Sequence, residues 1–157
     1  SCTDLVATVT YPLRRMYGYM AWADARALAT LRGMAEPPKQ ALDIFGHLLA
    51  AEHIWLRRID GVVHLYDIWQ TIGIDECERL AQANHAGFSR VLAEADRQRD
   101  ISYHSIAGDP YTTPLDEILI HVSHHGAYHR GQIALLVRGA DIAPMSTDYI
   151  LYQRENA

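Results

Sequence analysis

The sequence is poor in features that mark several common classes of protein. It has only two cysteines, Cys2 and Cys77, and their spacing fits neither a disulfide framework nor a cysteine-based metal site. Acidic residues outnumber basic ones, 19 to 14, and the formal net charge is -5. Because a duplex-binding surface needs a basic field to displace counterions from phosphates, we expect no nucleic-acid partner.

Long apolar runs are also missing. No stretch approaches the roughly 18 apolar residues that a membrane span requires, so we expect no membrane partner. The first residues, SCTDLVATVTYPLRR, lack the basic start and apolar centre of a secretory signal peptide. These two observations predict a cytoplasmic protein.

Apolar periodicity predicts four long helices within a single domain that covers residues 1–157. Apolar side chains recur at three- and four-residue steps in four segments, residues 11–34, 39–59, 75–97 and 114–138. Pro37 and Pro38 separate the first two segments, and Gly61 and Gly139 are the expected stops of the second and fourth. Thr113 is the expected N-terminal cap of the fourth.

Two shorter elements complete the predicted fold. The segment ISYHSIAGDPYTTP, residues 101–114, alternates apolar and polar residues on one side of a Gly-Asp-Pro turn, which favours a small hairpin or an extended crossing. A last short helix is expected over residues 146–153. The predicted fold class is therefore all-α: a four-helix bundle with a small hairpin between helices 3 and 4 and a short extra C-terminal helix.

Histidine is abundant, with nine in 157 residues, and three of them form a pattern. His121, His125 and His129 are four residues apart, so on a helix they lie along one stripe. Two imidazoles at that spacing can bind one metal ion. A histidine from another helix can complete a three-nitrogen site with positions left for water or substrate, and His47 on the second predicted helix is the candidate.

Spacing alone leaves the ligand set open. The pairs 121/125 and 125/129 are equivalent, and His125 belongs to both. His124 lies about 100° from the stripe and should face another helix or solvent. The ordinary interpretation, a surface or hydrogen-bonded residue, suits four further histidines: His53, His64, His85 and His104.

Three segments resemble the DinB/YfiT-like family of helical bundles. The fourth predicted helix and the tail after it, PLDEILIHVSHHGAYHRGQIALLVRGADIAPMSTDYILY, resemble the C-terminal signature of that family. FGHLLAAEHIWLRRIDG resembles its second-helix motif, and YGYMAWADARAL resembles its first-helix motif. The resemblance covers nearly the whole chain in the expected order.

The resemblance implies a four-helix bundle with three histidines on one divalent metal. Carried onto this sequence, the ligands are His47, His125 and His129, and His121 becomes a neighbour of the site. The expected ion is zinc or nickel, with iron or manganese as alternatives. Arg130 and Gln132 match the HRGQ motif, and we interpret both first as structural residues. A homodimer is a further expectation from the resemblance.

For function, the resemblance implies transfer of a low-molecular-weight thiol to an electrophilic small molecule, as in a thiol S-transferase. A metal held by three neutral ligands can lower the pKa of a bound thiol or water. Two alternatives stay open: a metal-dependent hydrolase without a thiol cosubstrate, and a non-catalytic, metal-stabilised binding or sensing module. Residues expected to line a pocket, or else to be ordinary core, are His121, Tyr128, Tyr17, Trp22 and Trp55.

Overall fold

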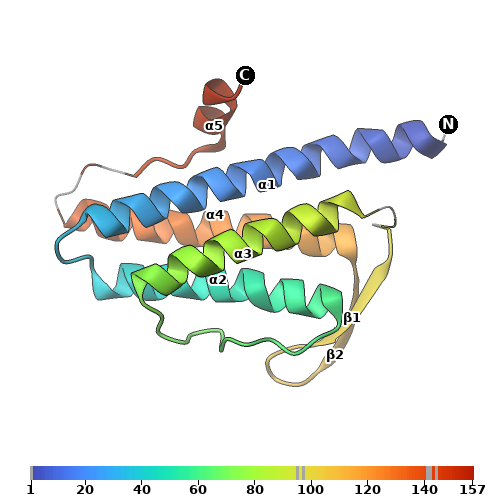
Figure 1. Ribbon diagram of the computed structural model, residues 1–157, viewed down its shortest axis with the longest axis horizontal. Helices are drawn as coiled ribbons and strands as arrows, with labels where there is room; N and C mark the ends of the chain where they lie inside the picture. Colours follow the sequence, from blue (N-terminus) through green and yellow to red (C-terminus); the bar gives the residue numbers. More distant parts are fainter. Residues whose placement is uncertain (1, 95, 97, 141–142, 144) are drawn as a thin grey trace.

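The computed structural model describes the backbone of residues 2–94, 96, 98–140, 143 and 145–157, and within those ranges the side chains from Pro12 onward. It contains five helices and one hairpin, in the order α1 (Cys2–Gly33), α2 (Lys39–Asp60), α3 (Ile74–Ala93), β1 (Asp100–His104), β2 (Pro110–Pro114), α4 (Leu115–Gly139) and α5 (Tyr149–Glu155) (Figure 1). The predicted all-α bundle with a small hairpin and a short C-terminal helix is confirmed.

Several predicted ends were wrong. The first helix was expected to start at residue 11 but begins at Cys2 and runs through Pro12, because one proline removes only one bond of the backbone ladder. The third was expected to reach Arg97, yet Glu94 already has an extended backbone and pairs with Arg90 and Arg99. Residues 95 and 97 lie outside the described part of the chain.

The fourth helix has no side-chain cap of the predicted kind. Pro114 occupies the N-cap position without a side-chain hydrogen bond. Thr113 belongs to β2, where it pairs with Ile101, and its hydroxyl lies 3.1 Å from the hydroxyl of Tyr103. The expected cap was therefore wrong, because strand pairing with β1 takes this residue instead. The last helix starts three residues later and ends two residues later than expected, over Tyr149–Glu155.

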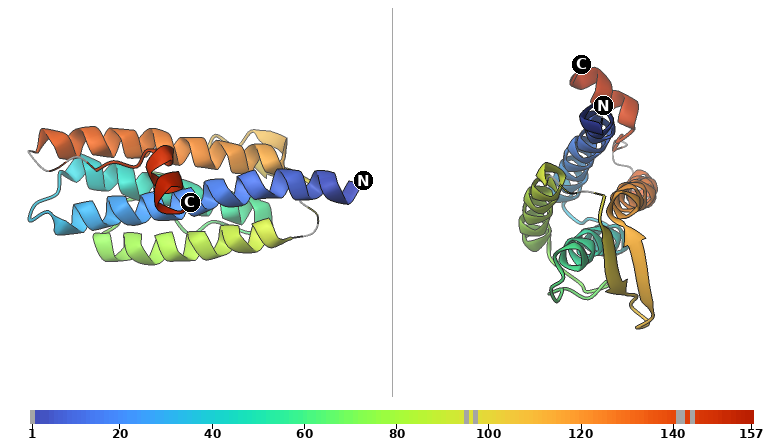
Figure 2. Two further views of the ribbon diagram at one scale, coloured as in Figure 1. Left: turned by 90° about the horizontal axis from the view of Figure 1, so that it is seen from above. Right: turned by 90° about the vertical axis from the view of Figure 1, so that its right-hand side faces the viewer.

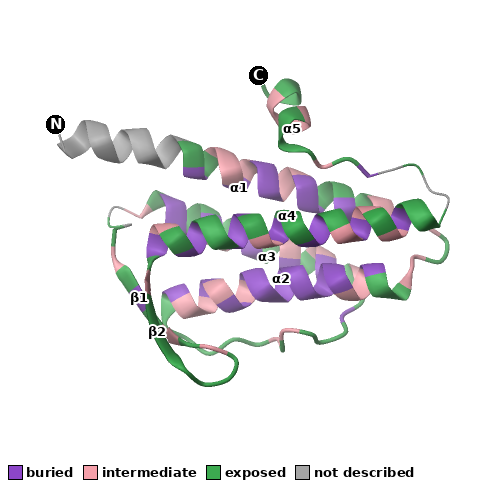
Figure 3. Ribbon diagram, turned by 180° about the vertical axis from the view of Figure 1, so that it is seen from behind, coloured by how far each residue is buried: buried purple, intermediate pink, exposed green. Residues whose placement is uncertain are grey.

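The four long helices surround a common core in the order α1, α3, α2, α4, with α4 closing back onto α1 (Figure 2). Helix α5 lies outside this ring, against α1. Burial is nearly continuous along the middle of α2, whereas the hairpin is mainly exposed (Figure 3). Helix α2 therefore has neighbours on two sides, α4 on one and α3 on the other.

The core consists of two clusters of buried apolar side chains. One lies toward the hairpin and includes Tyr17, Met20, Phe88 and Leu119; the other lies toward the α1–α2 turn and includes Phe45, Leu48, Leu49 and Ile133. Each fully buried side chain of this size contributes about 1.5–3 kcal/mol relative to an exposed one. Alanines at 23, 27 and 41 let the helices approach closely, since all three are fully buried.

A buried ion pair lies among these apolar residues. Arg130 on α4 is 0% exposed, and its Nη1 donates to Oδ1 of Asp24 on α1 at 2.7 Å. A methyl group added at Gly126, one turn earlier on α4, would lie 2.9 Å from that Nη1. The absence of a side chain at Gly126 therefore makes room for the guanidinium, and the pair joins α4 to α1 at a defined rotation.

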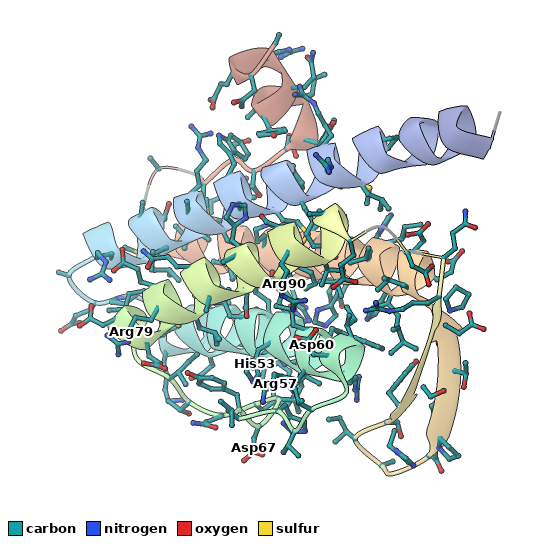
Figure 4. All side chains as sticks on the ribbon, turned by 45° about the vertical axis from the view of Figure 1, so that its right-hand side comes forward. His53, Arg57, Asp60, Asp67, Arg79 and Arg90 are labelled. Atoms are coloured by element: carbon teal, nitrogen blue, oxygen red, sulfur yellow. The ribbon has the colours of Figure 1, made fainter. Side chains whose placement is uncertain are left out.

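The long segment between α2 and α3, residues 61–73, is attached to α2. Gly61 ends α2 in the left-handed conformation, with φ of 69°, as expected for a helix stop. His53 accepts a hydrogen bond from the backbone amide of Leu65, and Nε of Arg57 donates to the carbonyl of Val63. Both side chains extend from α2 toward this segment, and the Arg90–Asp60 ion pair joins α3 to the end of the same helix (Figure 4).

The close approach of α3 to α2 depends on Gly87, which gives a first prediction. A methyl group there would lie 2.8 Å from Cδ1 of the buried Leu56, whereas one at Gly131 on α4 would have no neighbour within 4 Å. Gly131→Ala should stabilise the protein by about 0.5–1 kcal/mol through helix propensity. Gly87→Ala should destabilise it, because overpacking costs about 1–3 kcal/mol. Urea unfolding of both variants measures this; equal effects would contradict the packing at Gly87.

Candidate metal centre

Three histidines meet where α2 faces α4. Nε2 of His129 lies 3.1 Å from Nε2 of His47 and 3.1 Å from Nε2 of His125. One ligating atom from each of the three rings lies within 4.8 Å of the others. His47 and His129 are buried and His125 is half-buried. These are the three residues that the resemblance selected. The fold brings them together from α2 and α4, where His47 and His129 are 82 residues apart in the chain.

Hydrogen bonds on the far side of two rings set their tautomers. Nδ1 of His47 lies 2.8 Å from the carbonyl oxygen of Ile68, and Nδ1 of His129 lies 2.7 Å from Oε1 of Gln132. Because both partners are acceptors, each Nδ1 carries the proton and donates it. The Nε2 atoms of His47 and His129 then face each other with their lone pairs at 3.1 Å, and neither atom carries a proton to donate to the other. A cation between the rings satisfies these lone pairs, so the residues present fit a metal.

The environment favours the neutral form of His125 and His47. Burial, followed by the charges of His129, His47 and His121, lowers the pKa of His125 to about 4. Burial also lowers the pKa of His47, since it outweighs the hydrogen bond to Ile68. Neutral imidazole is the form that binds metal ions, so near neutral pH His47 and His125 need not lose protons first.

One side of the centre is open. The indole of Trp69 stacks on the His47 ring, with centroids 3.7 Å apart and an interplanar angle of 10°, yet Trp69 is 59% exposed. Tyr128 lies with its ring 5.1 Å from His129 and is 66% exposed. Three protein nitrogens leave at least one ligand position of a four-coordinate ion for water or substrate.

The five expected pocket residues divide between two regions. His121 lies next to the centre, with its ring 5.7 Å from that of His125, and Trp55 packs on His121 at 5.5 Å. Tyr128 is the third residue at this end. Tyr17 instead lines a cavity between α1 and α3, and Trp22 donates a hydrogen bond to Glu155 beyond the bundle. The structure therefore does not bring Tyr17 and Trp22 to the histidines.

Three further histidines make hydrogen bonds outside the cluster. His124 is exposed and its Nδ1 donates to the carbonyl of Ile120 on its own helix. His64 donates to the carbonyl of Tyr66, and His53 holds the 61–73 segment as described. This segment supplies Ile68 and Trp69 to the centre. His53 thus supports the site without being one of its three clustered ligand candidates.

Sequence reasoning missed Trp69, the carbonyl of Ile68 and the orienting role of Gln132. Gln132 follows His129 by three residues, so helical spacing already places the two side chains together. Its bond lies within α4, whereas Arg130 is the motif residue that reaches a neighbouring helix. No such signal exists for Ile68 and Trp69, since they lie in an irregular segment whose path depends on tertiary contacts.

Fold and site together define a four-helix bundle with a three-histidine centre that can hold a metal ion. The family description "DinB family" matches residues 15–156. The chain belongs to the DinB family.

A curated relative agrees over a shorter stretch. The chain is 50% identical over 40 residues to Protein DinB of Bacillus subtilis (strain 168), an alignment that covers 26% of this chain and 23% of the relative. Since the chain is matched to less than a quarter of that protein's length, its activity is not transferred on this basis. Among the described helices, none has the length and apolarity needed to cross a membrane.

Metal binding at these residues gives a second prediction. Zinc or nickel added to chelator-treated protein, purified without an affinity tag, should raise the melting temperature. A ligand at a hundred times its Kd stabilises by about 2.7 kcal/mol. His129→Ala should abolish the shift and the metal content measured by elemental analysis. His124→Ala, on the exposed side of the same helix, is the matched control; an equal loss in both variants would rule out this centre.

The lowered histidine pKa values give a third prediction, for the chelator-treated protein. The unfolded chain binds protons on histidine near pH 6.5, whereas folded His125 does so only at about 4. The unfolded state therefore holds more protons between these values, and the free energy of unfolding should fall as pH falls through this window. Urea unfolding at about pH 7 and about pH 5 measures the loss. His125→Leu should show a smaller pH dependence; an unchanged one would refute the assignment.

Proposed function

We propose that this chain is a metal-dependent enzyme in which His47, His125 and His129 bind a divalent ion and a low-molecular-weight thiol attacks an electrophilic small molecule. The observation that carries the proposal is that the Nε2 lone pairs of His47 and His129 face each other. Hydrogen bonds to Ile68 and Gln132 place the ring protons on Nδ1 and so set these tautomers. When bound, the ion lowers the pKa of a thiol or water and so supplies a nucleophile near neutral pH. Zinc and nickel both suit imidazole ligands.

The chain's own residues support the reaction by holding and orienting. The Ile68 carbonyl and the Gln132 amide orient the rings of His47 and His129, which keeps their two Nε2 atoms close together before a ligand arrives. Trp69 covers one face of His47 and restricts the approach of solvent to that ring. We expect substrate to approach from the side of the half-buried His125, next to His121 and Trp55.

The reaction balances without a further cofactor. The thiol loses its proton to solvent, its sulfur forms a bond to the electrophilic carbon, and the leaving group departs with the bonding electron pair. The nucleophile in the hydrolytic alternative is water, and the same three histidines serve it. Three neutral ligands favour both, because they leave the positive charge of a divalent ion undiminished.

An activity screen gives the fourth prediction. Protein loaded with zinc or nickel should conjugate at least one of a panel of small thiols to an aryl chloride such as chlorodinitrobenzene, with release of chloride. His129→Ala should lower the rate by about a hundredfold or more, the scale of losing a group essential to nucleophile activation. His124→Ala should retain the rate.

Ester and amide substrates run in parallel separate the alternatives. If p-nitrophenyl acetate is turned over without a thiol, and His129→Ala abolishes this turnover, the result would contradict the transferase and favour the hydrolase. Full metal occupancy with no turnover of any substrate would contradict an enzyme and favour a binding or sensing module. The homodimer stays a prediction that a solution mass measurement decides, and cytoplasmic location stays a prediction as well.

A further inference from the structure

A second site lies on the opposite side of α2 from the histidines. A cavity of about 240 Å³ opens between α1 and α3, and Glu52 of α2 is among its lining residues. Glu52 follows His47 by five residues, which turns its side chain by about 140° around the helix. His47 therefore faces α4, while Glu52 faces α3, where its Oε2 accepts a hydrogen bond from Nδ2 of Asn84 at 3.1 Å.

The other carboxyl oxygen of Glu52 has no partner when both nearby carboxyls are ionised. Glu52 is 4% exposed, and among the described residues no N–H or hydroxyl donor reaches its Oε1. Its neighbour is the carboxyl of Asp24, with which Glu52 forms a hydrogen bond only when the two share a proton. A buried polar atom without a hydrogen bond is costly, so native proteins nearly always supply a partner. Since Glu52 lines the cavity, a ligand there can supply the missing donor.

The charges around the cavity favour a cation as that donor. Asp24 and Glu52 are both buried beside it, and Arg130, paired with Asp24, is the buried cation that accompanies them. With both carboxylates ionised, Asp24, Glu52 and Arg130 together carry a net charge of about -1. Burial, and then the charge of Asp24, raises the pKa of Glu52 well above its usual range. A proton therefore neutralises Glu52 when no other cation does.

The remaining walls suit an apolar body. Tyr17 and Phe88 lie side by side at the cavity with ring centroids 4.7 Å apart, and Met20 and Leu28 extend the apolar surface. Aromatic faces attract cations as well as apolar groups. The described lining includes no lysine or arginine, and Glu78 at the cavity is paired with Arg32.

We propose that this cavity is a binding site for a small organic cation, a primary ammonium group on an apolar or aromatic body, with the ammonium donating to Oε1 of Glu52. A cavity of about 150 Å³ holds benzene, so this one holds a molecule of roughly ten non-hydrogen atoms. An arylalkylamine has that size and that distribution of charge. The site requires no metal and goes beyond the function proposed for the histidines.

Calorimetric titration of the full chain with phenethylamine, with and without chelator, tests the site. We expect saturable binding of the amine. Phenethyl alcohol, which has the same shape, and the anion phenylacetate should each bind at least about tenfold more weakly, since a hydrogen bond between charged groups contributes that factor or more. Glu52→Gln should lower the affinity for the amine by a similar factor. Glu117→Gln, which removes an exposed carboxylate on α4, should leave it unchanged.

A second pair of variants guards against misfolding of Glu52→Gln. Ala25 is exposed and lines the cavity, so Ala25→Phe should block it; Ala29→Phe, on the same helix outside the cavity, should not. Zinc uptake by the histidines, measured in all four variants, should persist, which separates this site from the metal centre. Equal binding of amine and alcohol, amine binding that survives both Glu52→Gln and Ala25→Phe, or no saturable amine binding would overturn the proposal and leave a water-filled cavity.

Discussion

The buried ion pair between Arg130 and Asp24 is the constraint on which the arrangement of both sites depends. The Arg130 guanidinium is 0% exposed, and its Nη1 donates to the carboxylate of Asp24 at 2.7 Å. Removing one member of such a pair strands a buried charge and typically costs about 3–5 kcal/mol. Such pairs are weak contributors to stability against an apolar replacement, but they discriminate strongly between helix rotations.

That rotation decides where the histidines point. Arg130 follows His129 directly, so the two side chains leave α4 about 100° apart. When Arg130 reaches Asp24 on α1, His129 is turned toward α2, where its ring meets His47. Rotating α4 by one residue would separate His129 from His47 and leave Arg130 without its carboxylate. We infer that the ion pair and the metal centre fix the same rotation from two sides.

Helix α2 also presents polar side chains on two different sides. His47 faces α4 and the 61–73 segment, while Glu52 faces α3 and the cavity. The apolar residues between them, Leu48 and Leu49, are fully buried and separate the two polar regions. Helix α2 thus carries one nitrogen ligand candidate, His47, on one side and the buried carboxyl of Glu52 on the other.

From the sequence alone, the four helices, the hairpin, the Gly61 stop and the stripe of histidines followed, because periodicity and turn residues are local properties of the chain. Helix ends were less accurate, as at Glu94 and Thr113, since ion pairs and strand pairing competed with local preference. Spacing left His121 and His129 equivalent, and only the resemblance distinguished them. The tertiary structure alone decided which imidazole nitrogens converge, that Ile68 and Trp69 support them, and that Glu52 lies unpartnered at a cavity. These depend on the relative rotation of helices and on the path of a loop, which contacts between distant residues set.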